Sequence, residues 1–399
     1  MSKLPRPVFL FGLVSLFNDF ASEMIYPLLP AFVTTVLGGG ALSLGALDGA
    51  AEFAAAFVKY GAGRLADAPR RRGPLIILGY VVAVLVRPVI ALTGAAWQVI
   101  GLRVTDRVGK GIRTPPRDAL IADVTPPALL GRAFGFQRGL DHAGAVLGPL
   151  AAWWLLSSKR LDLRGVIGAS IVPGLVVLVL AVWAVADGRR RARRDEGGQG
   201  RTKADEGGKG RTKADEGVRS LGPLLAISSF YLLRMPETLL LLRTQQLGVT
   251  VSSVLLLWAA LHVVRSFTSF LGGALSDRFG PLRTMWLGWV CYAAIALGFA
   301  LEGTAAAAWG LFLVLGTVAG LTESPERAIV SRLAGSRQGT GFGAYHAATG
   351  MAALAGGLLL GALYQWRGAP LAFVVSAAGV TFAALWVAVA ARRRTAIAS

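Results

Sequence analysis

The chain alternates long apolar stretches with short joints, and this pattern limits its fold more than any other feature. A bilayer core is about 30 Å thick, so a helix that spans it needs roughly 20 mostly apolar residues. Twelve stretches of that kind are predicted as transmembrane helices, at residues 7–36, 42–63, 74–94, 97–122, 133–156, 165–187, 221–245, 251–273, 283–302, 305–331, 340–364 and 369–391. We therefore predict an all-α membrane protein.

The composition supports a bilayer environment. Of the 399 residues, 54% are hydrophobic and only 16% are charged, whereas about 25% of an ordinary soluble domain is charged. This balance, with a mean hydropathy of +0.58, excludes a disordered chain, a collagen-like chain and a soluble enzyme of ordinary composition. Cys291 is the only cysteine, which excludes an intrachain disulfide and a cysteine-based metal cluster.

The basic residues predict the orientation. A net charge of +19 suggests nucleic acid as a partner of a soluble protein, but in a membrane protein it more often reflects basic cytoplasmic loops. Basic residues concentrate in the joints after the second and eighth stretches and in the tail: Arg64, Arg70, Arg71, Arg72, Arg278, Arg283, Arg392, Arg393 and Arg394. We predict a multi-pass protein of the inner (plasma) membrane, with both termini cytoplasmic, membrane lipids as partners and no nucleic acid. Lys159, Arg160 and Arg164 violate this assignment.

The longest joint, residues 188–219, is hydrophilic and repetitive. The decapeptide GQGRTKADEG at 198–207 is followed by GKGRTKADEG at 208–217. Mixed charge with Gly and no large apolar residue predicts a flexible cytoplasmic linker. A nucleic-acid-binding arm is the alternative, and the interleaved acids argue against it. The linker separates residues 1–187 from residues 220–399.

The two parts of the chain resemble each other. Three motifs of the first part recur in the second at an offset of about 210 residues, which indicates a duplication. The pairs are Gly63-x-Leu65-x-Asp67 with Gly273-x-Leu275-x-Asp277, Gly111–Ala119 with Gly320–Ala328, and Phe134-Gly135 with Phe342-Gly343. We predict two pseudo-symmetric six-helix bundles, an N-terminal bundle at 1–187 and a C-terminal bundle at 220–399.

Ionisable residues occur near the middle of several predicted spans. They are Asp19, Glu23, Glu52, Arg87, Arg103, Asp106, Arg107, Lys110, Asp141, Arg234, Glu237, His262 and Arg265. A charge that faces lipid at this depth costs at least ~2.5–3.5 kcal/mol, and a dozen such costs would exceed the ~5–15 kcal/mol net stability of a protein. These side chains are therefore predicted to face a shared interior, where intramembrane charge marks a functional site.

Helical spacing places several of these residues on common faces. In the first span the polar face is Ser15, Asp19, Ser22, Glu23 and Tyr26, and in the fourth it is Arg103, Asp106, Arg107, Lys110, Arg113, Thr114 and Arg117. The second face is mostly basic, which suits a substrate with a carboxylate or phosphate group. The alternative is that these charges are structural partners of acids on other helices.

Three glycine motifs predict close helix contacts. Gly63 and Gly273 permit close approach, and Asp67 and Asp277 are candidates to cap a neighbouring helix. In the fifth span Gly144, Gly148 and Pro149 predict tight packing and a bend. The chain has no Walker-type motif, no metal-ligand spacing and no nucleophile elbow. We therefore expect no ATP site, no metal, no cofactor and no enzymatic activity.

At these residues the chain resembles the major facilitator superfamily. Gly63–Asp67 followed by Arg71-Arg72 is similar to the family's loop motif, with Ala68 and Arg70 as departures, and Gly273–Gly280 matches it more fully. Arg107-x-x-Lys110-Gly111 resembles its fourth-helix motif, with Lys110 where Gln is common. Gly144–Pro149 resembles the fifth-helix motif of its antiporters, although Ala152-Trp153 replaces a final glycine pair. The resemblance implies alternating access by two bundles, a proton-coupling role for Arg107, and export.

We therefore predict a monomeric secondary transporter that expels a small organic solute by proton-coupled antiport. Proton-coupled uptake of an anionic solute is the nearest alternative, and a non-transporting scaffold or receptor is a more distant one. Asp19, Glu23 and Glu52 are the candidate proton carriers, with Arg107 as their switching partner. The candidate substrate-binding residues are Arg103, Lys110, Asp141, Arg234, Glu237, His262 and Arg265.

Overall fold

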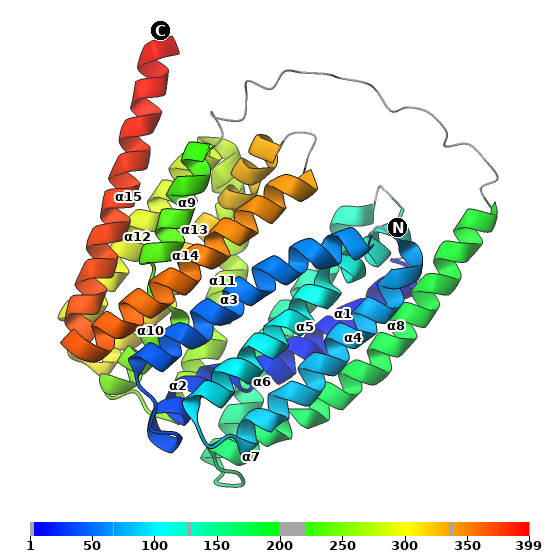
Figure 1. Cartoon of the computed structure of the whole chain (residues 1–399), viewed down its shortest axis with the longest axis horizontal. Coiled ribbons are helices and arrows are strands. Elements are labelled where there is room, and N and C mark those ends of the chain that lie inside the picture. Colours follow the sequence, from blue (N-terminus) through cyan, green and yellow to red (C-terminus); the bar gives the residue numbers. More distant parts are fainter. Residues whose placement is uncertain (1–3, 67, 127–128, 199–220, 335–337, 399) are drawn as a thin grey trace.

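The computed structural model describes residues 4–66, 68–126, 129–198, 221–334 and 338–398. Every regular element in these residues is helical, as predicted (Figure 1). The helices are α1 (Arg6–Glu23), α2 (Leu29–Ala31), α3 (Ala41–Ala66), α4 (Pro69–Val89), α5 (Ala96–Asp123), α6 (Leu130–Ser157), α7 (Leu163–Ala169), α8 (Ile171–Gly198), α9 (Leu221–Leu233), α10 (Glu237–Gln246), α11 (Val251–Phe279), α12 (Pro281–Leu301), α13 (Ala305–Ala334), α14 (Gln338–Arg367) and α15 (Ala369–Ala398).

Each predicted apolar stretch corresponds to one helix or to an interrupted helix. Among the described residues, 10 helical segments are long and apolar enough to cross a membrane. The two predicted stretches outside this set are α5, which carries a dense run of charged residues, and α6, which is rich in Gly and polar residues. The structure thus supports a multi-pass membrane protein, while length and apolarity alone do not establish all twelve predicted spans.

Two of the predicted spans are interrupted by proline. The first continues beyond α1 through a 3₁₀ turn at Tyr26–Leu28, α2 and a π turn at Phe32–Val36. The seventh is split between α9 and α10 at Pro236, which precedes the first residue of α10. Proline has no backbone N–H and disfavours helical geometry at the preceding residue, so it breaks a helix there. Tyr26 and Pro236 both border the cavity described below.

The helices pack mainly with partners from their own part of the chain. α1 packs against α6 and α8, and α5 packs against α3 and α4. In the second part, α13 packs against α11 and α12, and α15 packs against α9, α12 and α14. The two parts meet chiefly along α3 and α14, which run side by side through the middle of Figure 1, and also along α6 and α11.

Glycines produce two of the tightest helix contacts. A Cβ atom on Gly45 would collide with the backbone of Gly357, so α3 and α14 touch at backbone distance. A Cβ on Gly144 or Gly148 would likewise collide with carbonyl oxygens of α1. The packing predicted for the fifth-span motif is therefore confirmed.

The predicted close approach at Gly63 and Gly273 is wrong in this structure. A Cβ on either glycine would have no atom of the described residues within 4 Å, so neither glycine lies in a close helix contact there. Asp277, the acid of the second motif copy, is exposed on α11. Asp67, the acid of the first copy, lies outside the described residues.

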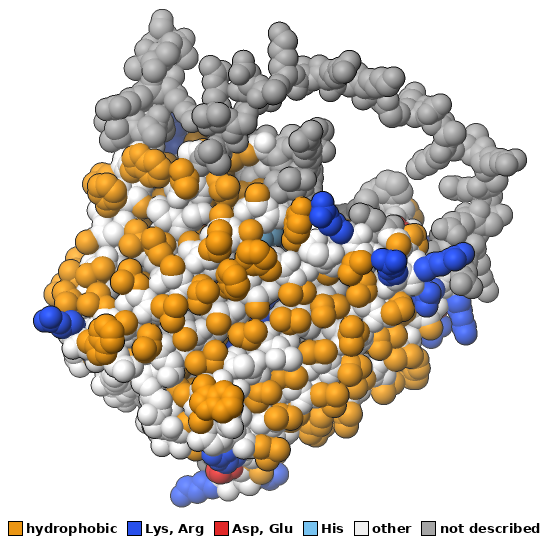
Figure 2. Space-filling model, viewed as in Figure 1, with side chains coloured by type: hydrophobic (Ala, Val, Ile, Leu, Met, Phe, Trp, Pro, Cys, Tyr) orange, Lys and Arg blue, Asp and Glu red, His pale blue; other side chains and the backbone are white. Residues whose placement is uncertain are grey.

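The surface is mostly apolar across the middle of the molecule. Figure 2 shows hydrophobic side chains over the central band and Lys and Arg side chains near the edges. Leu92, Trp97, Phe267, Trp366 and Phe382 are each at least 70% exposed. Apolar exposure on this scale is unfavourable in water but is expected of helices that face lipid tails.

Candidate functional site

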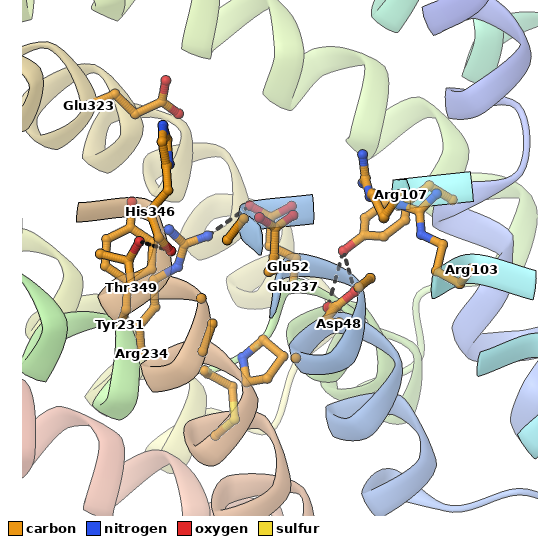
Figure 3. A pocket seen from close by; sticks show the side chains of 18 of the residues that line it. Asp48, Glu52, Arg103, Arg107, Tyr231, Arg234, Glu237, Glu323, His346 and Thr349 are labelled. Atoms are coloured by element: carbon orange, nitrogen blue, oxygen red, sulfur yellow. Dashed lines mark hydrogen bonds and ion pairs between the residues drawn. The ribbon is translucent and has the colours of Figure 1, made fainter. Parts of the chain in front are cut away.

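A cavity of about 350 Å³ lies between the two parts of the chain, within the range of small-molecule pockets. Its walls come from α1, α3 and α5 on one side and from α9, α10, α11, α13 and α14 on the other. Figure 3 shows Arg103, Arg107 and Asp48 across the cavity from Tyr231 and His346, with Glu52 and Glu237 between them. The charged and titratable lining residues are Glu23, Tyr26, Asp48, Glu52, Lys59, Arg103, Arg107, Tyr231, Arg234, Glu237, His262, Arg265, Glu323 and His346.

Glu237 is held by two arginines. It is the first residue of α10, directly after the break at Pro236. Arg234 Nη2 lies 3.0 Å from Glu237 Oε1 (Figure 3), and Arg265 of α11 pairs with the same oxygen. Because one carboxylate serves both guanidinium groups, these residues form a cationic cluster on the wall contributed by the second part of the chain.

Asp48 of α3 joins the two parts of the chain. Its Oδ2 accepts hydrogen bonds from the backbone N–H of Thr238 at 3.0 Å and from the Thr238 hydroxyl at 2.9 Å. The Tyr26 hydroxyl donates to Asp48 Oδ1 at 3.0 Å. Thr238 is the second residue of α10, so Asp48 satisfies a free N–H at the start of a helix from the opposite half.

Two of the arginines on the predicted basic face, Arg103 and Arg113, belong to a buried network of ion pairs and hydrogen bonds. We call this network the lock. Asp106 Oδ1 lies 2.9 Å from Arg87 Nε, and Asp106 Oδ2 lies 3.3 Å from Arg103 Nη1. Arg87 also donates to the backbone carbonyl of Asn18 at 3.0 Å, and Arg113 donates to the Asn18 side chain at 3.1 Å. For these residues the structural alternative raised by the sequence therefore holds. Arg103 combines both roles, since it also lines the cavity.

The other cavity charges are not paired in this way. Within the described ranges, Arg107, Lys59 and Glu52 take part in no ion pair, and Arg107 Nε is buried without a hydrogen-bond partner. A buried guanidinium group with an unused donor is costly unless a further acceptor enters the site. Arg107 and Lys59 are therefore cavity cations without an ion-pair partner in the described residues.

Glu23 connects α1 to α11. Trp258 Nε1 donates to Glu23 Oε2 at 2.8 Å, and His262 Nε2 lies 3.8 Å from the same oxygen. The Trp258 and His262 rings meet edge to face at 5.3 Å between centroids. A carboxyl group, an imidazole and an aromatic wall thus share one corner of the cavity.

The structure brings most of the predicted site residues together. Glu23, Glu52, Arg107, Arg103, Arg234, Glu237, His262 and Arg265 all line the cavity. Three predicted residues are not part of its lining, namely Asp19, Lys110 and Asp141. Asp19 accepts from Asn18 at 2.9 Å, and Asp141 accepts from Gln137 at 3.0 Å. None of the three therefore borders the cavity in this structure.

Several lining residues were missed by the sequence analysis. They are Asp48, Lys59, Tyr231, Trp258, Glu323, His346 and Thr349. Asp48 and Lys59 lie near the two ends of the predicted stretch 42–63, where charge is ordinary. The remaining residues are scattered over four helices, α9, α11, α13 and α14, and only the packing of those helices brings them together.

Comparisons with known proteins agree on the family. The sequence profile of the Major Facilitator Superfamily matches residues 11–350 and 224–398. An uncharacterised MFS-type transporter of Methanocaldococcus jannaschii is 27% identical over 370 residues, covering 92% of this chain and 90% of that protein. A multidrug resistance protein of Photorhabdus laumondii is 31% identical over 133 residues, which is 33% of each chain. A solved bacterial homologue of the human lysosomal transporter Spinster, inward-facing and unoccupied, is similar over 97% of this chain and 96% of its own, with a TM-score of 0.70 and 17% identity.

Proposed function

The chain belongs to the major facilitator superfamily, and from this premise we propose that it is a secondary transporter that exports a small organic solute in exchange for protons. The observation that carries the proposal is the cavity between the two parts of the chain, where Arg107 and Lys59 have no ion-pair partner among the described residues. Transporters of this kind bind substrate near the membrane midplane, between two structural repeats.

The proposal includes twelve spans in two pseudo-symmetric six-helix bundles. α5 and α6 are long enough to span, at 28 residues each, and the α5 residues Arg103 and Asp106 are buried in ion pairs rather than exposed to lipid. The motif pairs detected in the sequence support a duplication of the bundle. Alternating access then corresponds to rocking of one bundle against the other around the cavity.

Export is supported by the partial similarity to a multidrug resistance protein and by the fifth-helix glycines that pack on α1. Uptake of an anionic solute together with protons is the second candidate. It is favoured by Arg107 and Lys59, because two cations without ion-pair partners attract a carboxylate or phosphate group. We further propose a monomer in the inner membrane, with both termini and the 188–219 linker in the cytoplasm.

Flux measurements in liposomes test this function. The purified protein is reconstituted into liposomes that contain the pH-sensitive dye pyranine, and a pH gradient is imposed. Carboxylate- and phosphate-bearing metabolites and amphiphilic drugs are then added one at a time. We expect at least one compound to collapse the gradient faster than in protein-free liposomes, and Arg107→Ala to abolish this effect.

The same assay separates the two candidates. Antiport predicts that liposomes with an acidic interior accumulate the solute, whereas symport predicts accumulation when the exterior is acidic. Arg327→Ala is the matched control, because Arg327 is exposed on α13 and is not part of the cavity lining. If no compound moves protons in either direction, the proposed function is wrong.

A further inference from the structure

Glu326 is a fully buried carboxyl group that the cavity charges do not neutralise. It lies on α13 and is 1% exposed. The hydroxyl of Tyr345, from α14, donates to Glu326 Oε2 at 2.9 Å, and the hydroxyl of Tyr231, from α9, donates to the same oxygen at 3.2 Å. The other oxygen, Oε1, is buried and has no hydrogen-bond partner among the described residues. Among the described residues, Oε2 therefore accepts two hydrogen bonds and Oε1 accepts none.

No basic side chain of the described residues is within ion-pair distance of Glu326. The charged and titratable groups around it are Tyr231, Arg234, Tyr345 and Glu323. Arg234 is engaged by Glu237, and Glu323 carries the same sign as Glu326. An anion would leave a charged oxygen buried and unpaired, which is costly, whereas protonation removes this charge and gives the carboxyl group an O–H that can donate to a tyrosine oxygen.

The repeated motifs allow the corresponding positions in the two parts of the chain to be compared. The repeat aligns Glu326 with Arg117 of α5, and Tyr345 with Gln137 of α6. In the first part of the chain, Arg117 pairs with Asp118 at 2.9 Å, and both Arg117 and Gln137 bond to the Ser15 hydroxyl, at 3.4 and 2.7 Å. The equivalent junction in the second part holds an unpaired acid between two phenols. The first part therefore has an ion-paired base at this position, and the second has an acid without an ion-pair partner among the described residues.

Tyr231 links this carboxyl group to the cavity. Tyr231 is part of the cavity lining, and its hydroxyl bonds to Glu326 on the other side. Resting on the proposed transport function, we propose that Glu326, Tyr231 and Tyr345 form a proton-binding site, with Tyr231 as the path between the carboxyl group and cavity water.

The loading step balances without any further reactant. A hydronium ion in the cavity gives a proton to the Tyr231 hydroxyl oxygen, while the phenol's own proton moves along its hydrogen bond to Glu326 Oε2. The products are a water molecule, an unchanged phenol and a neutral carboxyl group. Unloading is the reverse, and no covalent bond other than O–H changes.

The charge of Glu326 also affects helix packing. A carboxylate accepts stronger hydrogen bonds than a neutral carboxyl group, so the ionised site holds α9 and α14 to α13 more tightly. α14 is the helix that touches α3 at the Gly45–Gly357 contact. Proton binding at Glu326 therefore loosens the attachment of the helix that joins the two parts of the chain.

Infrared difference spectroscopy of the full chain in lipid membranes tests the site without a known solute. A protonated carboxyl group has a C=O stretching band that is lost on ionisation as the pH is raised. We expect Glu326→Gln to remove one such band and Glu323→Gln, on the same helix, to retain it. Tyr231→Phe and Tyr345→Phe should keep the band but shift it, because each removes one hydrogen bond to Oε2.

These variants keep the test decisive even if Glu326→Gln does not fold, because Glu326→Asp and the two phenylalanine variants then report through the band position. An unchanged wild-type band in all of them would overturn the proposal. Failure of the transport function would look different: no solute collapses a pH gradient in pyranine-loaded liposomes, while the infrared band still depends on Glu326. Solute-driven proton flux that persists in Glu326→Gln at the wild-type rate would overturn the inference and leave the transport function intact.

Discussion

At the scale of single residues, intramembrane charges are of two kinds. Some are held in buried ion pairs, and others have no ion-pair partner among the described residues. Asp106 is buried between Arg87 and Arg103, so its charge stabilises the junction of α4 and α5. Arg107, one helical turn from Arg103, has no such partner in the described residues. The sequence reveals both kinds equally, because each is a charge in an apolar stretch. Which of them is paired depends on how neighbouring helices are rotated, and no local pattern contains that information.

The lock predicts a large loss of stability for Asp106→Asn. This change leaves two buried guanidinium groups without their shared carboxylate, and removing one partner of a buried ion pair costs about 3–5 kcal/mol. Thermal unfolding of the detergent-solubilised protein, followed by tryptophan fluorescence, measures the effect. Glu323→Gln serves as the control, since its pair with Arg327 is exposed at 3.7 Å and such pairs contribute about 0–1 kcal/mol. Equal melting temperatures for the two variants would contradict the assignment.

Asp48 shows where residue-level prediction ends. Its partner Thr238 is 190 positions away in the chain, and neither residue belongs to a recognisable motif. Asp48 meets Thr238 only because α10 begins at the proline break, which exposes free N–H groups toward α3. The sequence shows the proline, but it does not show which helix contacts the N-terminal end of α10.

At the scale of helices, the sequence predicts that a helix exists better than it predicts where that helix is interrupted. Apolar stretches of spanning length appear as helices because few other structures satisfy the backbone inside a bilayer. The interruptions at Tyr26–Leu28 and before Glu237 were not predicted, although prolines mark both. Both interruptions border the cavity, and interrupted helices supply backbone groups and side chains to transporter binding sites.

Glycines that mark helix contacts give the second prediction. Gly144→Ala places a methyl group against the Leu16 carbonyl oxygen, and such overpacking costs ~1–3 kcal/mol. Gly63→Ala is the matched control, because its added methyl group meets open space and alanine favours a helix by roughly 0.5–1 kcal/mol over glycine. Thermal unfolding should therefore show a clear loss for the first variant and none for the second. A loss of similar size in both would show that the motif at Gly63 packs in a way that this structure does not display.

At the scale of the whole molecule, the fold follows from repeated apolar stretches and a duplicated motif set. These features predict the family, which the profile match over residues 11–350 and 224–398 confirms. The solute cannot be predicted in the same way, because the cavity mixes acids and bases from eight helical elements. Its selectivity depends on which charges remain unpaired after folding, and those are visible only in the assembled site.

The linker gives a prediction about the assembly. Residues 199–220 lie outside the described part of the chain, and their repeated polar sequence has nothing to bury. Removing residues 198–217 should leave folding and flux nearly unchanged while a tether remains. Loss of flux with normal insertion would reveal a role for the linker.

The predicted topology is tested with cysteines at positions 202 and 399, which should be shielded from an impermeant thiol reagent in intact cells. Labelling of either from outside would contradict the topology.

Coupling of protons to solute movement is the last property of the whole molecule that the site makes testable. Burial raises the pKa of a carboxyl group and a nearby arginine lowers it, so an acid that meets Arg107 in only one state of the cycle loads and releases a proton. Glu23 and Glu52 line the cavity with Arg107, whereas Asp19 does not. We therefore expect Glu23→Gln or Glu52→Gln to abolish pH-driven accumulation while solute exchange continues, and Asp19→Asn to have the smaller effect. The measurement is accumulation and exchange of the same solute in liposomes, with thermal unfolding to separate loss of coupling from loss of folding.

If all three neutral variants fold and still drive uphill transport with the wild-type pH dependence, the carriers lie elsewhere. Coupling would then be assigned to Glu326 with its two tyrosines alone, because it is the buried acid that Tyr231 connects to the cavity.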